Sequence, residues 1–108
     1  MDKYEVKLLP KAYRDIDQIY EYISAELRSP EAALNLVVSF EDAVLSLEKL
    51  SRRGSERKIG VYANRGYRQL FIKNFTIVYR IDEKMKHVIV VTVKYSPSKY
   101  PLIPINAN

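Results

Sequence analysis

The residues of this sequence that are best suited to chemistry are arginines, lysines and tyrosines in its C-terminal half. Arginine can bind a phosphate or a carboxylate through two hydrogen bonds at once. Tyrosine offers a ring on which a base can stack and a phenol that can donate a proton. The residues of these types on the last predicted strands, or just after them, are Arg68, Lys73, Arg80, Lys94, Tyr95, Lys99 and Tyr100.

Such a cluster could bind RNA, and it could also cleave RNA. In that reaction a 2′-hydroxyl attacks the adjacent phosphate, and cations stabilise the crowded negative charge. An Arg or Lys is a demanding choice as the base, because its pKa would have to be strongly depressed. The same residues have a plain alternative interpretation as solvated strand residues and tyrosines at the rim of the core, and their types leave both interpretations open.

Further cations lie in the segment 51–66, which has no clean hydrophobic period and is predicted to be a loop. Arg57 and Lys58 of this loop join the predicted RNA-binding residues, which are Arg57, Lys58, Lys73, Lys94 and Lys99. A short strand near 58–62 is the one regular element expected within the loop.

Other kinds of site find little support. The sequence has no cysteine, which excludes disulfides, thiolate zinc sites and a cysteine nucleophile. Its one histidine, His87, falls at a predicted turn with no cluster of acidic residues around it. The three glycines form neither a phosphate-binding loop nor a dinucleotide fingerprint. No metal and no small-molecule cofactor is therefore expected.

Charge is divided unequally along the chain. Residues 1–51 hold 6 Lys or Arg and 10 Asp or Glu, whereas residues 52–108 hold 12 Lys or Arg and 3 Asp or Glu. The front half is therefore acidic and the back half strongly basic. This segregation favours a polyanion or an acidic protein as partner of the back half, with an idle basic surface as the alternative.

The length of 108 residues fits one domain, 1–108. No apolar run is long enough to span a membrane, and the N-terminus lacks the features of a signal peptide. We therefore expect a protein without a membrane segment, located in the cytoplasm.

Two helices and several strands should position the candidate residues. YEVKLL (4–9) is predicted to be a strand, and apolar residues at helical spacing predict helices over 10–27 and 30–51. Ser29 is a suitable N-cap, Pro30 suits the first helical position, and Gly54 is a plausible terminator. The short link predicts an antiparallel helical hairpin.

The second half should be mostly strand. Residues 67–73, 75–81 and 87–95 are rich in β-branched and aromatic residues and have short links, which predicts an antiparallel meander. The tail, 101–108, should be irregular. The expected fold class is α+β, in the order β-α-α-β-β-β, with a twisted antiparallel sheet covered on one face by the helical hairpin. The cations within 66–81 are expected to point to the uncovered face.

Several phrases in this order resemble the RelE/ParE superfamily of type II toxin–antitoxin systems, also known as plasmid stabilisation proteins. They are DIDQIYEYI, SPEAALNL, GYRQLFIKNFTIVYRI and VIVVTVKYSPSKY, and together they cover the chain from about residue 3 to residue 100. The resemblance implies a growth-inhibiting toxin that is held inactive by a cognate antitoxin. The RelE branch cleaves messenger RNA on the ribosome, as a metal-independent endoribonuclease. The ParE branch instead poisons DNA gyrase and has no known hydrolytic site. The shared fold leaves both branches open, together with an inactive member of the fold.

The resemblance also implies catalytic residues for the RelE branch, namely Arg68, Arg80, Tyr95 and Tyr100. Arg68 matches a strand cation that contacts phosphate, and Tyr100 matches a terminal tyrosine. Tyr95 or Ser96 falls near a position where the ribonucleases carry Arg or His, with Lys94 close by. Thr76 stands where those enzymes have an arginine, and Arg80, expected on the same strand face, could substitute for it.

Overall fold

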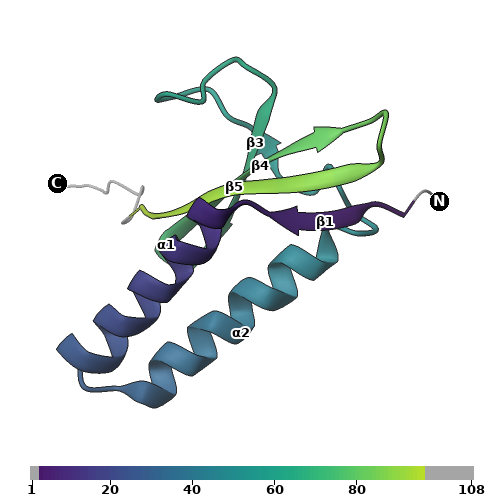
Figure 1. Ribbon diagram of the computed structural model, residues 1–108. Helices are drawn as coiled ribbons and strands as arrows, with labels where there is room; N and C mark the ends of the chain where they lie inside the picture. Colours follow the sequence, from purple (N-terminus) through teal and green to yellow (C-terminus); the bar gives the residue numbers. More distant parts are fainter. Residues whose placement is uncertain (1–2, 97–108) are drawn as a thin grey trace, which may run out of the picture.

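The chain forms one strand, then a helical hairpin, and then four further strands (Figure 1). The computed structural model describes residues 3–96. Its elements in order are β1 (Glu5–Leu8), α1 (Pro10–Glu21), η1 (Tyr22–Glu26), α2 (Pro30–Ser46), β2 (Ser55–Glu56), β3 (Tyr67–Ile72), β4 (Phe75–Asp82) and β5 (His87–Tyr95). The α+β class and the predicted order of the long elements are confirmed.

The strands form one five-stranded sheet in the order β1-β5-β4-β3-β2. Strands β3, β4 and β5 are the antiparallel meander that the sequence predicts. Strand β1 pairs with β5 in parallel, with Glu5 opposite His87 and Leu8 opposite Val90. The sheet is therefore mixed. The helical hairpin leaves from the end of β1 and brings the chain back beside its start, where the Tyr4 amide donates to the Glu48 carbonyl, so the later strands can include one parallel to β1.

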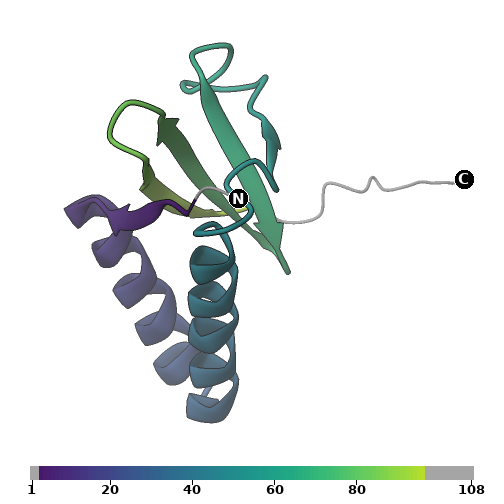
Figure 2. The ribbon, with the colours of Figure 1, turned by 90° about the vertical axis from the view of Figure 1, so that its right-hand side faces the viewer.

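The helical hairpin covers one face of the sheet (Figure 2). Ser29 caps α2 as predicted, since its hydroxyl accepts a hydrogen bond from the Ala32 amide at 3.3 Å. The first helix is completed by the π-helical turn η1. Helix α2 ends at Ser46 rather than at 51. The Ser46 hydroxyl donates to the Ala43 carbonyl at 2.6 Å, a local bond that competes with helix continuation.

The loop after α2 differs from the sequence prediction. Residues 58–62 form a bend followed by a turn rather than a strand, and the segment that joins the sheet is Ser55–Glu56. Gly60 has a φ of 80°, and the Arg57 side chain donates to the Ile59 carbonyl at 3.1 Å. Both features bend the chain at the place where a strand would have to be extended.

The core lies between the hairpin and the sheet. Its fully buried members include Phe40 of α2 and Ile77 and Tyr79 of β4. The rings of Phe40 and Phe75 meet edge to face, with centroids 5.5 Å apart, and this contact joins α2 to the sheet. Among residues 3–96, no helix is long and apolar enough to cross a membrane.

Candidate functional site

Arg68 lies on the side of the sheet that carries the helices. In the register of β3 with β4 it pairs with Tyr79, a member of the core between sheet and hairpin. Its Nη2 donates to the carbonyls of Arg52 and Gly54 in the loop that follows α2. The expectation that this cation points to the uncovered face is therefore wrong. Its guanidinium ties the loop to the sheet, and its Nε is buried without a partner among the described residues.

Arg57 is buried as well, with 7% of its surface exposed. Its Nε donates to the Ile59 carbonyl, and its Nη1 donates to Gln69 Oε1 at 2.7 Å. A side chain that is buried and bonded in this way has little surface left for a phosphate. The prediction that Arg57 contacts RNA therefore disagrees with its position, because the loop 57–66 folds back onto β3.

The opposite face of the sheet carries Arg80, which is exposed and pairs with Tyr67 of β3. Thr76 lies four residues away on the same face, as predicted, but it is fully buried. Its Oγ1 has no hydrogen-bond partner among the residues that the structure describes. Arg80 is therefore accessible on this face, whereas the Thr76 position offers no exposed site for a cation.

The remaining predicted residues are spread over three places. Lys58 is exposed in the loop, and Lys73 is exposed in the turn between β3 and β4, where its φ is 56°. Lys94 and Tyr95 are exposed at the end of β5. Lys99 and Tyr100 lie outside the described residues. The structure separates Arg68 from Arg80 by the thickness of the sheet. Lys94 and Tyr95 are consecutive on β5 and pair with Thr76 and Phe75, so their side chains also point to opposite faces.

A groove of about 720 Å³ lies beside the end of β5. The residues of α1, η1 and the segment to Leu27 that line it are Lys11, Asp15, Gln18, Ile19, Tyr22, Ile23 and Leu27. The residues from the sheet side are Asn74, Phe75, Thr92, Val93, Lys94 and Tyr95. Of all these residues, the sequence prediction included Lys94 and Tyr95 only. Tyr22 and Leu27 are both 58% exposed, so the groove presents two large apolar side chains at its surface.

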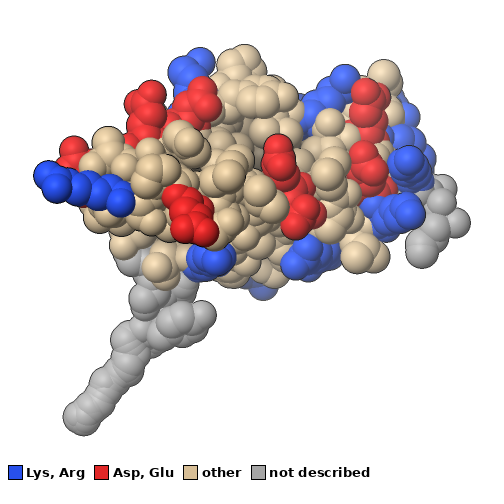
Figure 3. All heavy atoms as spheres, turned by 90° about the horizontal axis from the view of Figure 1, so that it is seen from below, with Lys and Arg blue, Asp and Glu red and all other residues tan. Residues whose placement is uncertain are grey.

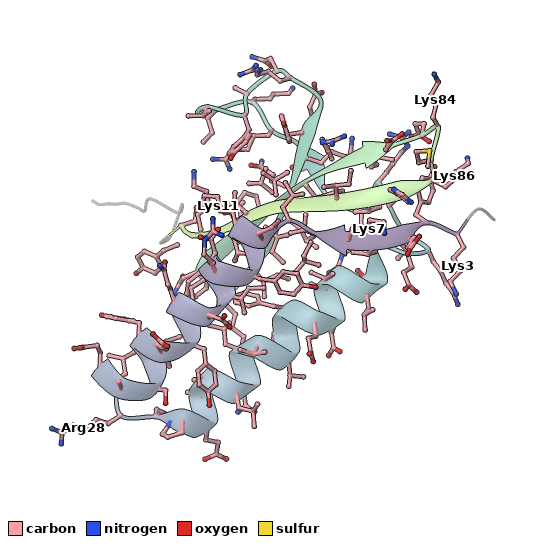
Figure 4. The ribbon with its side chains drawn as sticks, viewed as in Figure 1. Lys3, Lys7, Lys11, Arg28, Lys84 and Lys86 are labelled. Carbon is pink, nitrogen blue, oxygen red and sulfur yellow. The ribbon has the colours of Figure 1, made fainter. Side chains whose placement is uncertain are left out.

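Asp15 is the polar centre of the groove. Its carboxylate accepts hydrogen bonds from the Thr92 hydroxyl, from the Val93 amide at 3.1 Å and from Lys11 Nζ at 3.1 Å. Lys11 lies at the first turn of α1 (Figure 4). Burial works to raise the pKa of Asp15, but the bonds from Thr92, Val93 and Lys11 outweigh it and hold that pKa below its ordinary value. Nothing in the sequence near Asp15 reveals that β5 would lie beside it.

The groove combines aromatic and aliphatic side chains with one satisfied carboxylate and an exposed lysine, Lys94. Within residues 3–96, no group of three or more His, Cys, Asp or Glu side chains is placed to hold a metal ion. Such an apolar groove with a polar rim is typical of a site for a peptide or a protein segment.

Solved structures of known proteins share this architecture. A chain of the chromosomal ParDE toxin–antitoxin system from P. aeruginosa is 25% identical, with a TM-score of 0.72 over 87% of this chain and 97% of that chain. A chain of the toxin–antitoxin complex RelBE2 from Mycobacterium tuberculosis is 22% identical, with a TM-score of 0.62 over 91% and 97%. The YoeB/ParE toxin from Agrobacterium tumefaciens is 15% identical, with a TM-score of 0.54 over 84% and 96%.

A family model decides which family the chain belongs to. No curated protein matches the chain. The model described as the ParE toxin of the type II toxin–antitoxin system parDE matches residues 6–99, which is most of the sequence. The chain is therefore a member of the ParE toxin family, with the RelE/ParE fold.

Proposed function

We propose that this chain is the toxin of a type II toxin–antitoxin pair and that it arrests growth by binding its target, DNA gyrase, rather than by cutting RNA. The observation that carries the proposal is the position of Arg68. Its guanidinium is bonded to the carbonyls of Arg52 and Gly54 on the helix side, while Arg80 lies on the opposite face. A phosphate cannot contact both cations at once, so Arg68 and Arg80 do not form a converging pair that could stabilise a cleavage transition state.

The groove beside β5 is the surface we propose for the cognate antitoxin. It is apolar along η1 and Leu27, and it ends at the exposed Tyr95 and Lys94. An extended or helical segment with apolar residues and a few carboxylates would complement it. The likeness to the ParDE system of P. aeruginosa supports a partner of this kind.

A supercoiling assay with purified gyrase tests the proposed target. We expect the toxin, in molar excess, to inhibit gyrase, and we expect the purified antitoxin to restore supercoiling. If supercoiling is undiminished at a concentration of toxin that arrests growth in cells, gyrase is not the target. Toxin that causes no arrest on overexpression would instead indicate an inactive member of the fold.

Ribosome-dependent messenger RNA cleavage is the second candidate, and one observation favours it. Arg80, Lys73 and Lys94 remain exposed on or near the uncovered side of the sheet, so several cations are available there. Primer extension on ribosome-bound message tests this candidate. Cuts that appear with the natural chain and disappear with Arg80→Ala would establish it; a pattern without cuts during arrest would end it.

A further inference from the structure

Helix α2 has a second apolar face, which points away from the core. Its buried residues, which include Ala33, Leu36, Phe40, Ala43 and Val44, face the sheet and α1. Leu34, Val38 and Leu45 are spaced four and seven residues apart, so they form one stripe on the opposite side of the helix. Their exposures are 55%, 44% and 57%. We refer to these three residues as the outer stripe.

The outer stripe lies among carboxylates. Glu31, Glu41 and Asp42 are exposed on the same helix, and no Lys, Arg or His occurs from Ser29 to Glu48. Among the residues that the structure describes, no cation forms an ion pair with any of these three carboxylates. Seen from below, acidic side chains are scattered among uncharged ones, and Lys and Arg lie mainly around the margin (Figure 3).

We propose that the outer stripe docks an amphipathic helix of a partner protein whose apolar residues are flanked by Lys and Arg. The stripe from Leu34 to Leu45 is about 16 Å long, which matches roughly three turns of a partner helix. Leucines of the partner at spacings of three or four residues pack against the stripe, and its cations reach Glu31, Glu41 and Asp42.

The charge pattern also argues against a second copy of this chain as the occupant. An antiparallel pairing of two α2 helices that places Leu34 against Leu45 of the other copy also places Glu41 against its Val38, within one helical turn of its Glu41. Like charges held against each other in this way are destabilising. A cationic helix has no such conflict.

This face is separate from the groove, since none of the three stripe residues lines it. A partner on the outer stripe therefore leaves the groove free for the antitoxin. The proposal does not depend on whether gyrase or messenger RNA is the target. Its test measures only the binding of a peptide to the outer stripe of α2.

The test uses fluorescence anisotropy with the full chain and two labelled helical peptides of about five turns. One peptide has leucines at matching spacing flanked by Lys and Arg, and the other has Glu at every cationic position. We expect the cationic peptide to bind and the acidic peptide not to bind. The double variant Leu34→Ser, Leu45→Ser should weaken binding by about tenfold or more, because two apolar contacts are lost.

Two further variants make the result specific. Val61→Ser makes a similar change at an apolar residue that is 75% exposed in the β2–β3 loop, and it should leave the affinity unchanged. The double variant Glu41→Lys, Asp42→Lys should reverse the preference, so that the acidic peptide binds better than the cationic one. It keeps the outer stripe intact and provides a readout if the serine variant fails to fold.

Three outcomes overturn the proposal. The first is equal binding of both peptides, and the second is unchanged affinity in a folded Leu34→Ser, Leu45→Ser variant. The third is self-association in sedimentation equilibrium that the same serine substitutions abolish, because the face would then be an interface between two copies of this chain.

Discussion

Two hydroxyl groups are fully buried on β4, and they differ in their hydrogen bonds. Tyr79 Oη accepts from the Gly54 amide at 2.9 Å and donates to the Ser51 carbonyl at 2.8 Å. Thr76 Oγ1 has no partner among the described residues. The tyrosine hydroxyl therefore anchors the loop after α2, whereas the threonine hydroxyl is buried without a hydrogen bond to any described residue.

The variant Tyr79→Phe should lower the free energy of unfolding by about 1–3 kcal/mol, because it leaves a buried amide and a buried carbonyl without their partner. Urea denaturation of the natural chain and the variant measures the difference. Thr76→Val is the matched control on the same strand, and it should be neutral or stabilise by about 1 kcal/mol. A Thr76→Val variant that loses as much stability as Tyr79→Phe would contradict this assignment of roles.

Arg68 shows why residue type alone is a weak guide to function. Its cation looks suited to phosphate, yet its Nη2 is bonded to the Arg52 and Gly54 carbonyls. A loss of toxicity in Arg68→Ala could therefore come from a loosened loop. Arg80→Ala is the cleaner probe of a cation on the sheet, because Arg80 is exposed.

Helix α1 is joined to the edge of the sheet by Asp15. Strand β1 pairs with β5 only as far as Val90, and beyond that point Asp15 accepts from the Val93 amide. The carboxylate covers part of a strand edge that would otherwise present an unpaired N–H group. The spacing of the apolar residues predicts helix α1, but it does not predict that Asp15 covers this strand edge.

The pKa of Asp15 predicts how the docking of α1 on the sheet depends on pH. Because Thr92, Val93 and Lys11 hold its pKa below the ordinary value of 3.8 against the opposing effect of burial, ionised Asp15 stabilises the fold. This contribution is fully present above pH 3.8 and is lost as the pH falls through the lowered pKa of the folded state.

Asp15→Asn should cost about 1–2 kcal/mol at neutral pH, because a charged acceptor is replaced by a neutral one. The stability difference between the natural chain and this variant should shrink as the pH is lowered below 3.8. Chemical denaturation at a series of pH values measures the difference. Asp17→Asn, on the exposed side of α1, serves as the control and should show a much smaller effect. A difference that grows toward low pH would contradict the assignment.

The contact between β2 and β3 depends on a glycine that precedes β2. A Cβ on Gly54 would lie 2.3 Å from the Gln69 carbonyl oxygen and 2.9 Å from Tyr79 Oη. The sequence suggests Gly54 as a helix terminator, but the helix has already ended at Ser46. The glycine is needed because the loop passes close to the backbone of β3.

Gly54→Ala should destabilise the chain by roughly 3 kcal/mol, since the loop must move away from β3 and disturb the bonds of Tyr79 and Arg68. Thermal unfolding measures the loss. Gly66→Ala makes a useful comparison, because nothing lies within 4 Å of its Cβ position and its φ of 85° is the only obstacle. It should cost about 1 kcal/mol. Equal losses in the two variants would show that backbone conformation, rather than crowding, governs both sites.

At the scale of the whole molecule, the charge asymmetry of the sequence becomes a division between surfaces. Helix α2 carries no cation, while Lys3, Lys84 and Lys86 gather toward the end of the sheet that holds the β4–β5 turn (Figure 4). An acidic surface on the hairpin and basic surfaces on the sheet allow the chain to contact partners of opposite charge at different places.

The chain should unfold as one domain. Tyr4, beside the N-terminal strand, donates to Glu83 Oε1 at 2.7 Å, and its amide donates to the Glu48 carbonyl. The beginning of the chain is therefore tied both to the turn after α2 and to the β4–β5 turn. The chain has nine tyrosines and no tryptophan, so near-ultraviolet circular dichroism reports on tyrosine packing.

We expect the near-ultraviolet signal and the far-ultraviolet signal of the backbone to give one coincident transition in urea. Tyr4→Phe should shift the midpoint of that transition to lower urea without separating the two signals. Two transitions at different urea concentrations would show that the hairpin and the sheet unfold independently, contrary to the prediction of a single domain.

The sequence alone determined the order of the elements, the faces of the helices and the cap at Ser29. These features depend on residues that are close together in the chain, where apolar periodicity, Ser-Pro pairs and β-branched runs have local physical causes. The same local phrases were enough to indicate the RelE/ParE superfamily.

Only the tertiary structure decided which side of the sheet each cation occupies. Arg68 faces the helices because it is paired with Tyr79, and Arg57 is buried because its loop folds back to Gln69. Likewise, the groove and the hydrogen bond from the Val93 amide to Asp15 exist because β5 extends past the end of β1. Each of these positions depends on strand register between distant segments, and a shift of register by one residue would send every side chain to the other face.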